Sequence, residues 1–313
     1  MPPVVSIILP TFNRQEYLVP AIESVLAQTF EQWELIIADD GSADATRRYL
    51  QSLADPRIEV MLLEHTGKPC VISNLAIRRA RGQYIAFLDS DDLWLPEKLA
   101  AQLSSLRSHP ERRWSYTRFA LVDSAGNAAA STRDRDRPAP AGWVLEKLLR
   151  ASAVIAQPSV LVDRELLLQL NGFDEELTMC YDDDLWLRLA HCTEIDSVDA
   201  PLTLVRRHAQ HSGSDAQAWR DRKRVFEKAL GRNDDPRFAD TLRELCAQMA
   251  LGLAKSHARY GRRRDAVSSL LSCIPQCRRF PSQWFGAAFI VASRFAPGFV
   301  LSMARQWKLA HRP

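Results

Sequence analysis

The chain has 313 residues, enough for one large domain or for two domains of unequal size. A hydrophobic fraction of 46% and a charged fraction of 25% are ordinary for a soluble globular protein, and a net charge of +3 gives no reason to expect a nucleic-acid partner. The six cysteines are scattered and complete no zinc-site pattern, which favours reduced thiols in a cytoplasmic protein.

The first hundred residues alternate strand and helix signals. Short apolar runs predict buried strands at Val4–Leu9, Leu35–Ala38, Ile58–Leu63 and Tyr84–Leu88. Helical spacing predicts helices at Tyr17–Gln28, after a cap at Asp44, at Val71–Ala80 and from Pro96 onward. This alternation predicts an α/β fold, in which a Rossmann-like, mostly parallel sheet is flanked by helices.

The rest of the chain is less regular and then becomes helical. Trp114–Val122 is predicted to be a strand, and Ser131–Ala141, rich in Arg, Asp and Pro, a mobile loop. From Asp215 the spacing of apolar residues predicts a C-terminal α-helical region. Ala254–Gly261 and the residues after it resemble one helical hairpin of a tetratricopeptide-like unit. We therefore expect two domains, residues 1–214 and 215–313.

Polar residues follow three of the predicted strands. Thr11-Phe12-Asn13, Asp39-Asp40 and the run from Asp89 to Asp92 each come directly after a strand ends. In open α/β sheets ligands bind beyond the carboxyl ends of the strands, so these loops should converge on one edge of the sheet. The sequence predicts a functional site there.

The run Asp89-Ser90-Asp91-Asp92 has the chemistry of a metal site. Carboxylates suit hard cations such as Mg²⁺ or Mn²⁺, and alternate residues at a strand end can turn Asp89 and Asp91 toward one point. Taken alone, the same run also fits an Asp-rich turn that caps the next helix.

Several segments together resemble glycosyltransferase family 2, a large family of inverting enzymes with the GT-A fold. The resemblance is carried, in the expected order, by Val5–Arg14, Ser24–Phe30, Ile36–Ser42, Gly82–Asp92, Asn171–Glu175 and Asp182–Leu189. These segments lie between residues 4 and 212.

The resemblance assigns roles in binding a nucleotide-sugar donor. It implies that Pro10, Thr11, Phe12 and Asn13 line the nucleoside pocket and that Asp40 accepts a hydrogen bond from the uracil ring. Asp89 and Ser90 would lie near the ribose or the donor sugar. Asp91 would bind the metal, Mg²⁺ or Mn²⁺, and Asp92 would support or cap the loop.

The resemblance implies that Asp182 is the general base of an inverting reaction. Asp182 begins a predicted helix with Leu185, Trp186 and Leu189 on its buried face, and without the family match it reads as a helix cap. The usual Glu before this Asp is replaced by Tyr181, and the aromatic residue after it by Asp183. Asp183 or Asp184 therefore remains an alternative base.

Two further positions concern the charge of the diphosphate. Arg206-Arg207-His208 resembles the family's Arg-x-His segment, which implies phosphate binding by Arg207 and metal or diphosphate contact by His208; the alternative is a basic surface loop. Ser73 stands where many members carry Arg, and Lys68 is the candidate to supply that positive charge.

The function implied is metal-dependent, inverting transfer of a sugar from a nucleotide diphosphate sugar, a UDP-sugar by expectation. The acceptor would be a glycan or a lipid-linked glycan in bacterial-type cell-surface polysaccharide or glycolipid assembly. One alternative is a nucleotidyltransferase that makes nucleotide sugars, although the first strand lacks the glycine- and arginine-rich loop typical of that class. The other is a catalytically silent carbohydrate-binding or scaffold protein of the same fold.

The C-terminal segment combines aromatic and basic residues. From Lys255 to the end there are eleven basic residues and one acidic residue, Asp265. The apolar stretch Trp284–Met303 is interrupted by Arg294 and Pro297, which makes it a poor membrane span. This composition predicts either peripheral contact with the inner face of the cell membrane or a helical core.

Overall fold

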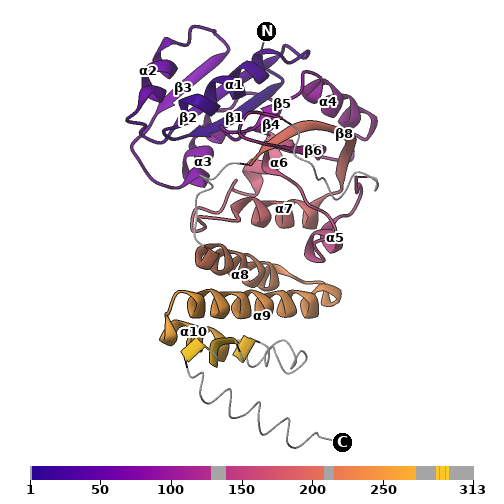
Figure 1. The fold of residues 1–313 in the computed structure, drawn as a ribbon. Coiled ribbons are helices and arrows are strands. Elements are labelled where there is room, and N and C mark those ends of the chain that lie inside the picture. Colours follow the sequence, from indigo (N-terminus) through magenta and orange to yellow (C-terminus); the bar gives the residue numbers. More distant parts are fainter. Residues whose placement is uncertain are drawn as a thin grey trace, which may run out of the picture. The chain divides into compact units, whose positions relative to one another are not determined.

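The computed structural model describes residues 2–127, 139–207, 215–272, 287–288, 290–292 and 294–295 (Figure 1). Contacts within the chain divide it into two compact units, Met1–His211 and Ser212–Pro313. Within the described ranges, no helix combines the length and the hydropathy that crossing a membrane requires.

The N-terminal unit is built on one mixed sheet. Among the described residues its strands are β1 (Val5–Thr11), β2 (Trp33–Asp39), β3 (Ile58–Leu62), β4 (Tyr84–Phe87), β5 (Leu93–Trp94), β6 (Trp114–Val122), β7 (Val160–Asp163) and β8 (Ile195–Arg206). They lie in the order β3-β2-β1-β4-β7-β6-β8-β5. The strands β3, β2, β1 and β4 are parallel, whereas β7 is antiparallel to both β4 and β6, and β5 is antiparallel to β8. The sequence predicted the four strands of this parallel half and, in the other half, β6.

Helices cover both faces of the sheet. They are α1 (Gln15–Leu26), α2 (Ala45–Ser52), α3 (Pro69–Arg79), α4 (Lys98–Ser108), α5 (Leu145–Leu149), α6 (Arg164–Gln169) and α7 (Tyr181–Cys192), with a 3-10 turn at Gln157–Ser159. The predicted cap is confirmed, because the Asp44 carboxylate accepts a hydrogen bond from the Thr46 amide at 2.9 Å. The helix expected to open at Pro96 begins two residues later, at Lys98.

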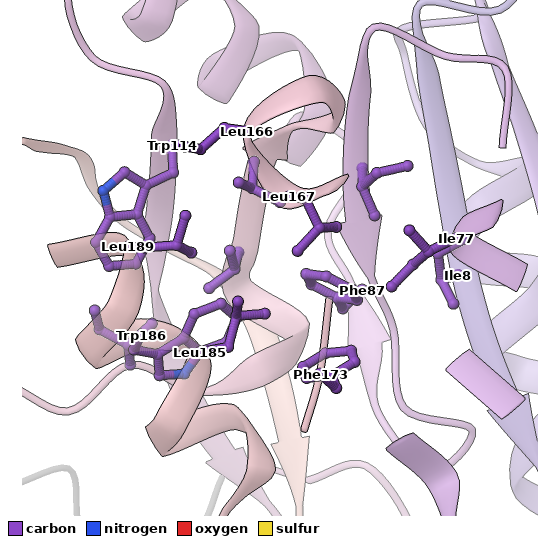
Figure 2. Packing of buried hydrophobic residues seen from close by; sticks show 14 of the residues in the cluster. Ile8, Ile77, Phe87, Trp114, Leu166, Leu167, Phe173, Leu185, Trp186 and Leu189 are labelled. Atoms are coloured by element: carbon purple, nitrogen blue, oxygen red, sulfur yellow. The ribbon is translucent and has the colours of Figure 1, made fainter. Parts of the chain in front are cut away.

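Alternation along the strands divides the core into two layers. Ile7 and Leu9 pack with α1, α2 and α4 on one face, whereas Ile8 packs with α3, α6 and α7 on the other. Figure 2 shows part of the second layer, in which Phe87 lies near Phe173 and Trp186. The fold is therefore the predicted α/β arrangement, with a sheet buried between two helical layers.

The C-terminal unit is helical, as the sequence predicted. It contains α8 (Asp215–Arg232), α9 (Pro236–Arg259), α10 (Arg263–Ser272) and helical residues between 287 and 295. Pro236 opens α9, and Gly261 has a φ of +74° in the short turn that joins α9 to α10. Small residues of α9 pack against α10 and against Ala287 and Val291, forming a separate core.

Candidate functional site

The three polar loops meet at one edge of the sheet. In the parallel register Thr11 pairs with Asp39, and Ile8 pairs with Phe87. Because β1, β2 and β4 run in the same direction, their carboxyl ends lie side by side, as expected for a ligand site of an α/β sheet. The candidate site is built from the residues that follow these ends.

The loop after β1 is held to the loop after β2 by hydrogen bonds. The Asn13 backbone has a φ of +48° and its amide donates to the Ser42 hydroxyl at 2.8 Å. The Asn13 side-chain oxygen accepts from the Ala43 amide at 2.9 Å, and the Asp39 carboxylate holds Ser42 in turn. Asn13 therefore shapes the loop through contacts within the protein.

The other residues expected in the nucleoside pocket differ in exposure. Pro10 and Thr11 are buried at the end of β1, and the Thr11 hydroxyl has no hydrogen-bond partner in the structure. Phe12 is 38% exposed, and its ring stacks on His65 with 4.3 Å between the ring centroids. Phe12 and His65 together form an aromatic surface beside Asp40.

Asp40 organises the segment that carries His65. One carboxylate oxygen accepts from the Thr66 amide at 2.8 Å and from its hydroxyl at 2.9 Å, and the other accepts from the Gly67 amide at 2.9 Å. His65 Nδ1 lies 3.0 Å from the same second oxygen. A nucleobase that hydrogen-bonds to Asp40 would therefore have to share a carboxylate that already has several partners.

Asp89 is the first residue of the acidic loop. Its removal from solvent and the nearby negative charges of Asp91 and Asp182 raise its pKa to about 7, while Arg14 acts in the opposite direction. The Gln157 side chain donates to Asp89 at 3.3 Å, which brings the 3-10 turn to the site. Asp89, Asp91 and Asp182 are thus close enough to interact electrostatically.

Asp91 forms an ion pair with Arg14. Arg14 Nη1 lies 2.6 Å from Asp91 Oδ2, and both side chains are mostly buried. Arg14 follows the loop after β1, so the pair joins the first and third polar loops. Ser90, between the two carboxylates, is buried.

Asp92 has a structural role in the same loop. Its carboxylate accepts from the Arg206 amide at 2.8 Å, and Arg206 Nε donates to the Asp91 carbonyl at 2.9 Å. Burial and the charges of Asp89 and Asp91 raise the pKa of Asp92 well above its usual value. Arg206, at the end of β8, therefore holds the acidic loop in place. The only sequence signal for this contact is the position of Arg206 in the Arg-Arg-His run.

Asp182 lies in the first turn of α7, next to Tyr181. The helix is preceded by Cys180 in a left-handed conformation, with a φ of +58°. Burial and the charges of Asp89 and Asp182 raise the pKa of the Tyr181 phenol well above its usual value, and the ring packs edge-on against Phe173 at 5.2 Å. Tyr181 therefore forms part of the wall around these carboxylates.

The Asp184 carboxylate takes part in a buried ion pair. It is 1% exposed and pairs with Arg188, whose Nη2 lies 2.7 Å from the carboxylate. Arg188 also donates to the carbonyl oxygens of Leu170 and Gly172, at 2.7 and 2.8 Å. This network fixes the loop before α7, and it argues against Asp184 as the alternative base.

A second set of contacts holds the same loop from α3. Asn74 accepts from the Phe173 amide and donates to the Phe173 carbonyl and the Glu175 carboxylate, each at 2.9 Å. Lys68 Nζ donates to the Glu175 carbonyl at 2.8 Å. Lys68 is thus engaged with this loop in the structure, and Asn74 is a positioning residue whose role the sequence pattern did not reveal.

The last two expected residues lie near the end of β8. The Arg207 amide donates to the Val122 carbonyl at 2.8 Å, and its side chain is exposed. His208, expected to contact the metal or the diphosphate, lies outside the described residues.

The acidic loop fits a divalent cation held mainly by its substrate. Across the part of the chain that the structure describes, no three His, Cys, Asp or Glu side chains come together as a ready metal site. Mg²⁺ commonly uses one or two carboxylates and completes its shell with substrate phosphates and water. The excess of carboxylates over Arg14 around Asp89 and Asp91 agrees with such a site.

The chain is similar in sequence to known glycosyltransferases. Residues 6–120 match the family model described as Glycosyl transferase family 2. The teichuronic acid biosynthesis glycosyltransferase TuaG of Bacillus subtilis is 37% identical over 165 residues, which cover 52% of this chain and 63% of TuaG. The Escherichia coli protein named UDP-Glc:alpha-D-GlcNAc-diphosphoundecaprenol beta-1,3-glucosyltransferase WfgD is 29% identical, over 72% of this chain and 84% of WfgD. The match thus spans less than two thirds of TuaG.

Solved structures support the fold. S. aureus TarS 1-349 in complex with UDP-GlcNAc aligns with a TM-score of 0.63 and 18% identity, covering 94% of this chain and 81% of that chain. The mannosyltransferase PcManGT of Pyrobaculum calidifontis, in complex with GDP-Man and Mn²⁺, aligns with a TM-score of 0.57 and 17% identity, covering 99% and 86%. At these identities the likeness concerns the fold alone.

Proposed function

Because this chain belongs to glycosyltransferase family 2, we propose that it is a metal-dependent inverting glycosyltransferase that uses a nucleotide diphosphate sugar. The observation that carries the proposal is the meeting of Asp89, Asp91 and Asp182 at the carboxyl edge of the parallel strands. A buried structural cluster would normally pair such carboxylates with cations, yet Asp89 retains a pKa raised to about 7.

The proposed reaction has one displacement step. The acceptor hydroxyl gives its proton to the Asp182 carboxylate while its oxygen forms a bond to C1 of the donor sugar. The bond between C1 and the diphosphate oxygen breaks, and the electron pair leaves with the nucleoside diphosphate. Attack from the face opposite the leaving group inverts the configuration at C1.

The remaining residues bind the donor. Phe12 and His65 offer an aromatic surface for the nucleobase, and Asp40 lies beside it. Asp91, with His208 as a candidate second ligand, would hold Mg²⁺ or Mn²⁺. When bound, that ion would offset the charge of the leaving diphosphate, and Arg14 and Arg207 are the candidate cations among the protein's own side chains.

The names of the relatives suggest the donor and the acceptor. WfgD is named for UDP-Glc and for a GlcNAc-diphosphoundecaprenol acceptor, and TuaG for teichuronic acid biosynthesis. On this support we assign the chain a UDP-sugar donor and a lipid-linked glycan acceptor in cell-surface polysaccharide assembly. The two structural neighbours carry different nucleotides, so the fold by itself does not select UDP.

A donor-hydrolysis assay tests the proposal. The purified chain is incubated with Mn²⁺ and a panel of nucleotide sugars, and release of the nucleoside diphosphate is measured with and without a GlcNAc-diphospholipid. We expect release from a UDP-sugar, stimulation by the lipid, and loss of both in Asp91→Ala. Absence of release across the whole panel would favour a catalytically silent protein instead.

A lipid-linked acceptor also motivates peripheral membrane contact at the inner face of the cell membrane. The basic excess after Lys255 supports it. Deleting the C-terminal segment is a poor test, because Ala287 and Val291 belong to the core of the C-terminal unit. Flotation with anionic liposomes should instead compare the chain with an Arg305→Ala, Lys308→Ala, Arg312→Ala variant, and equal binding of the two would count against this role.

A further inference from the structure

Gln157 is the side chain that directs the Asp89 carboxylate. Its amide nitrogen lies 3.3 Å from Asp89 Oδ1, within reach of a hydrogen bond, although 68 residues separate the two in sequence. Within the described ranges, no other group donates a hydrogen bond to this carboxylate. The orientation of the Asp89 carboxylate therefore depends on one neutral amide.

The turn that carries Gln157 is held from outside as well as from within. The Trp94 indole donates to the Pro158 carbonyl at 2.8 Å. The Gln102 amide donates to the Ser159 carbonyl at 3.0 Å. Because these bonds fix the backbone of the turn, and because Gln157 is only 5% exposed, its side chain has little freedom to turn away from Asp89.

The pairing of the strands brings this turn to the acidic loop. β7 follows the turn and is antiparallel to β4, with Leu161 opposite Ala86. The start of β7 therefore lies beside the end of β4, where the acidic loop begins. The contact between Gln157 and Asp89 is thus a consequence of the sheet topology.

The charge around Asp89 explains why a neutral donor suits this position. The negative charges of Asp91 and Asp182 act on Asp89, and the cation that opposes them, Arg14, is paired with Asp91. A second cation at Asp89 would compete with a metal ion for the carboxylates of the loop. An amide fixes the direction of the carboxylate and adds no charge.

Asp89 can still meet a ligand. It keeps part of its surface accessible, whereas Ser90 beside it is buried. An ionised carboxylate has about four acceptor positions, of which Gln157 takes one, and hydroxyl groups of a nucleotide sugar can donate to the others. An acceptor whose orientation is fixed in advance loses less freedom when the ligand binds, which favours affinity.

We propose that Gln157 is a positioning residue of glycosyl transfer, whose amide holds Asp89 in the orientation that accepts hydrogen bonds from hydroxyl groups of the nucleotide sugar. This inference rests on the proposed function and deepens it, because it adds a residue that the resemblance to the family did not indicate. The hydroxyl groups could belong to the ribose or to the transferred sugar, which share this chemistry.

Calorimetric titration of the full chain in the presence of Mn²⁺ tests the role. The probes are UDP, UDP-glucose and UDP-N-acetylglucosamine. Gln157→Met keeps roughly the size of the side chain but removes the donor, and it should weaken binding of a UDP-sugar about three- to thirtyfold. An equal loss for UDP identifies the ribose as the partner of Asp89, and a loss confined to the UDP-sugar identifies the transferred sugar.

Two further variants accompany this measurement. Gln83→Met alters an exposed glutamine before β4, at the opposite edge of the sheet, and should change the affinity less than about twofold. Gln157→Glu replaces the donor with a second carboxylate beside Asp89 and should weaken UDP-sugar binding at least as much as Gln157→Met. It takes the place of the methionine variant if melting temperatures show that the latter does not fold.

A double-mutant cycle separates positioning from general support of the fold. In an Asp89→Ala background, Gln157→Met should change the affinity less than about twofold, because the carboxylate that the amide orients is absent. A residue that only stabilises the turn would weaken binding by the same factor in both backgrounds.

Two results overturn the proposal. One is unchanged UDP-sugar affinity in both Gln157 variants, and the other is an equal loss with and without the Asp89 carboxylate. In either case the unaltered chain still binds and hydrolyses a UDP-sugar, so the transferase assignment stands. If the unaltered chain neither binds nor hydrolyses any nucleotide sugar of the donor panel, the proposed function is rejected, and the positioning role with it.

Discussion

Arg14 and Asp91 are joined across the site by a 2.6 Å ion pair, although 77 residues separate them in sequence. The guanidinium therefore lies at one oxygen of the carboxylate that we assign to the metal. A metal ion and Arg14 would compete for the same Asp91 carboxylate. The ion pair between Arg14 and Asp91 should therefore weaken metal binding in the absence of the donor.

This competition gives the first prediction. Arg14→Ala should tighten Mn²⁺ binding about three- to tenfold in the absence of donor, because it removes a positive charge worth roughly 1 kcal/mol at a partly exposed pair. Mn²⁺ titration followed by electron paramagnetic resonance measures it. Arg47→Ala, which removes an exposed cation of α2, is the matched control; equal affinities in the two variants would show that Arg14 does not compete.

The second prediction concerns proton transfer. Asp182→Asn should lower the transfer rate about 10²- to 10⁴-fold and leave donor affinity nearly unchanged, since the carboxylate acts on the acceptor. Asp183→Asn, in the same helical turn, should keep most of the activity. The transfer rate and the donor dissociation constant are measured for both variants. A large loss of rate in Asp183→Asn with activity retained in Asp182→Asn would identify Asp183 as the base.

The third prediction concerns the loop before α7. Arg188→Met should reduce the free energy of unfolding by about 3–5 kcal/mol, because it leaves the Asp184 carboxylate buried without its partner. Arg150→Met breaks an exposed pair with Glu146 at the same spacing and should cost less than about 1 kcal/mol. Urea unfolding measures both, and adding Asp184→Leu to Arg188→Met should recover part of the loss.

The fourth prediction uses the buried amine of Lys98. Its Nζ donates to Gln102 at 2.7 Å and lies 4.1 Å from the Trp94 ring centroid, and burial lowers its pKa well below the usual value. The unfolded chain then binds a proton that the folded chain lacks. Stability from this group should rise with pH, from the lowered pKa up to the ordinary lysine value, by at most about 1.4 kcal/mol per pH unit.

Lys98→Met removes this dependence. Urea unfolding of the chain and of Lys98→Met between pH 7 and 10 should give a stability difference that shifts in favour of the lysine form as the pH rises. Parallel profiles would mean that Lys98 stays charged in the folded protein.

The sequence was informative wherever structure is local. β1 and β2 were predicted because buried strands have continuous apolar runs, which can be read directly from the sequence. β6 was predicted as well, and its length makes it a clear strand. β8 was not predicted, because its residues vary between buried and exposed and include Pro201. β5 and β7, with two and four residues, are too short for a periodic signal.

The sequence predicted where the site residues lie along the sheet better than it predicted which residues they contact. Strand direction alone brought Asp40 and Asp89 to one edge, as expected. The partners of Asp91 and Asn74 depend on contacts between segments far apart in the chain, which no local pattern encodes. Asp182 and Asp184 look alike in sequence, and only the bonds of Arg188 separate a structural carboxylate from a candidate base.

The clamp between Arg206 and Asp92 also sets an order of events during synthesis. The four parallel strands and the acidic loop leave the ribosome first, but the amide that holds Asp92 lies 114 residues later in the chain. Until β8 has emerged, the loop lacks the two bonds from Arg206 that hold Asp91 and Asp92, whatever the state of the strands before it. A nascent chain can thus acquire most of its donor-side architecture well before it acquires a rigid acidic loop.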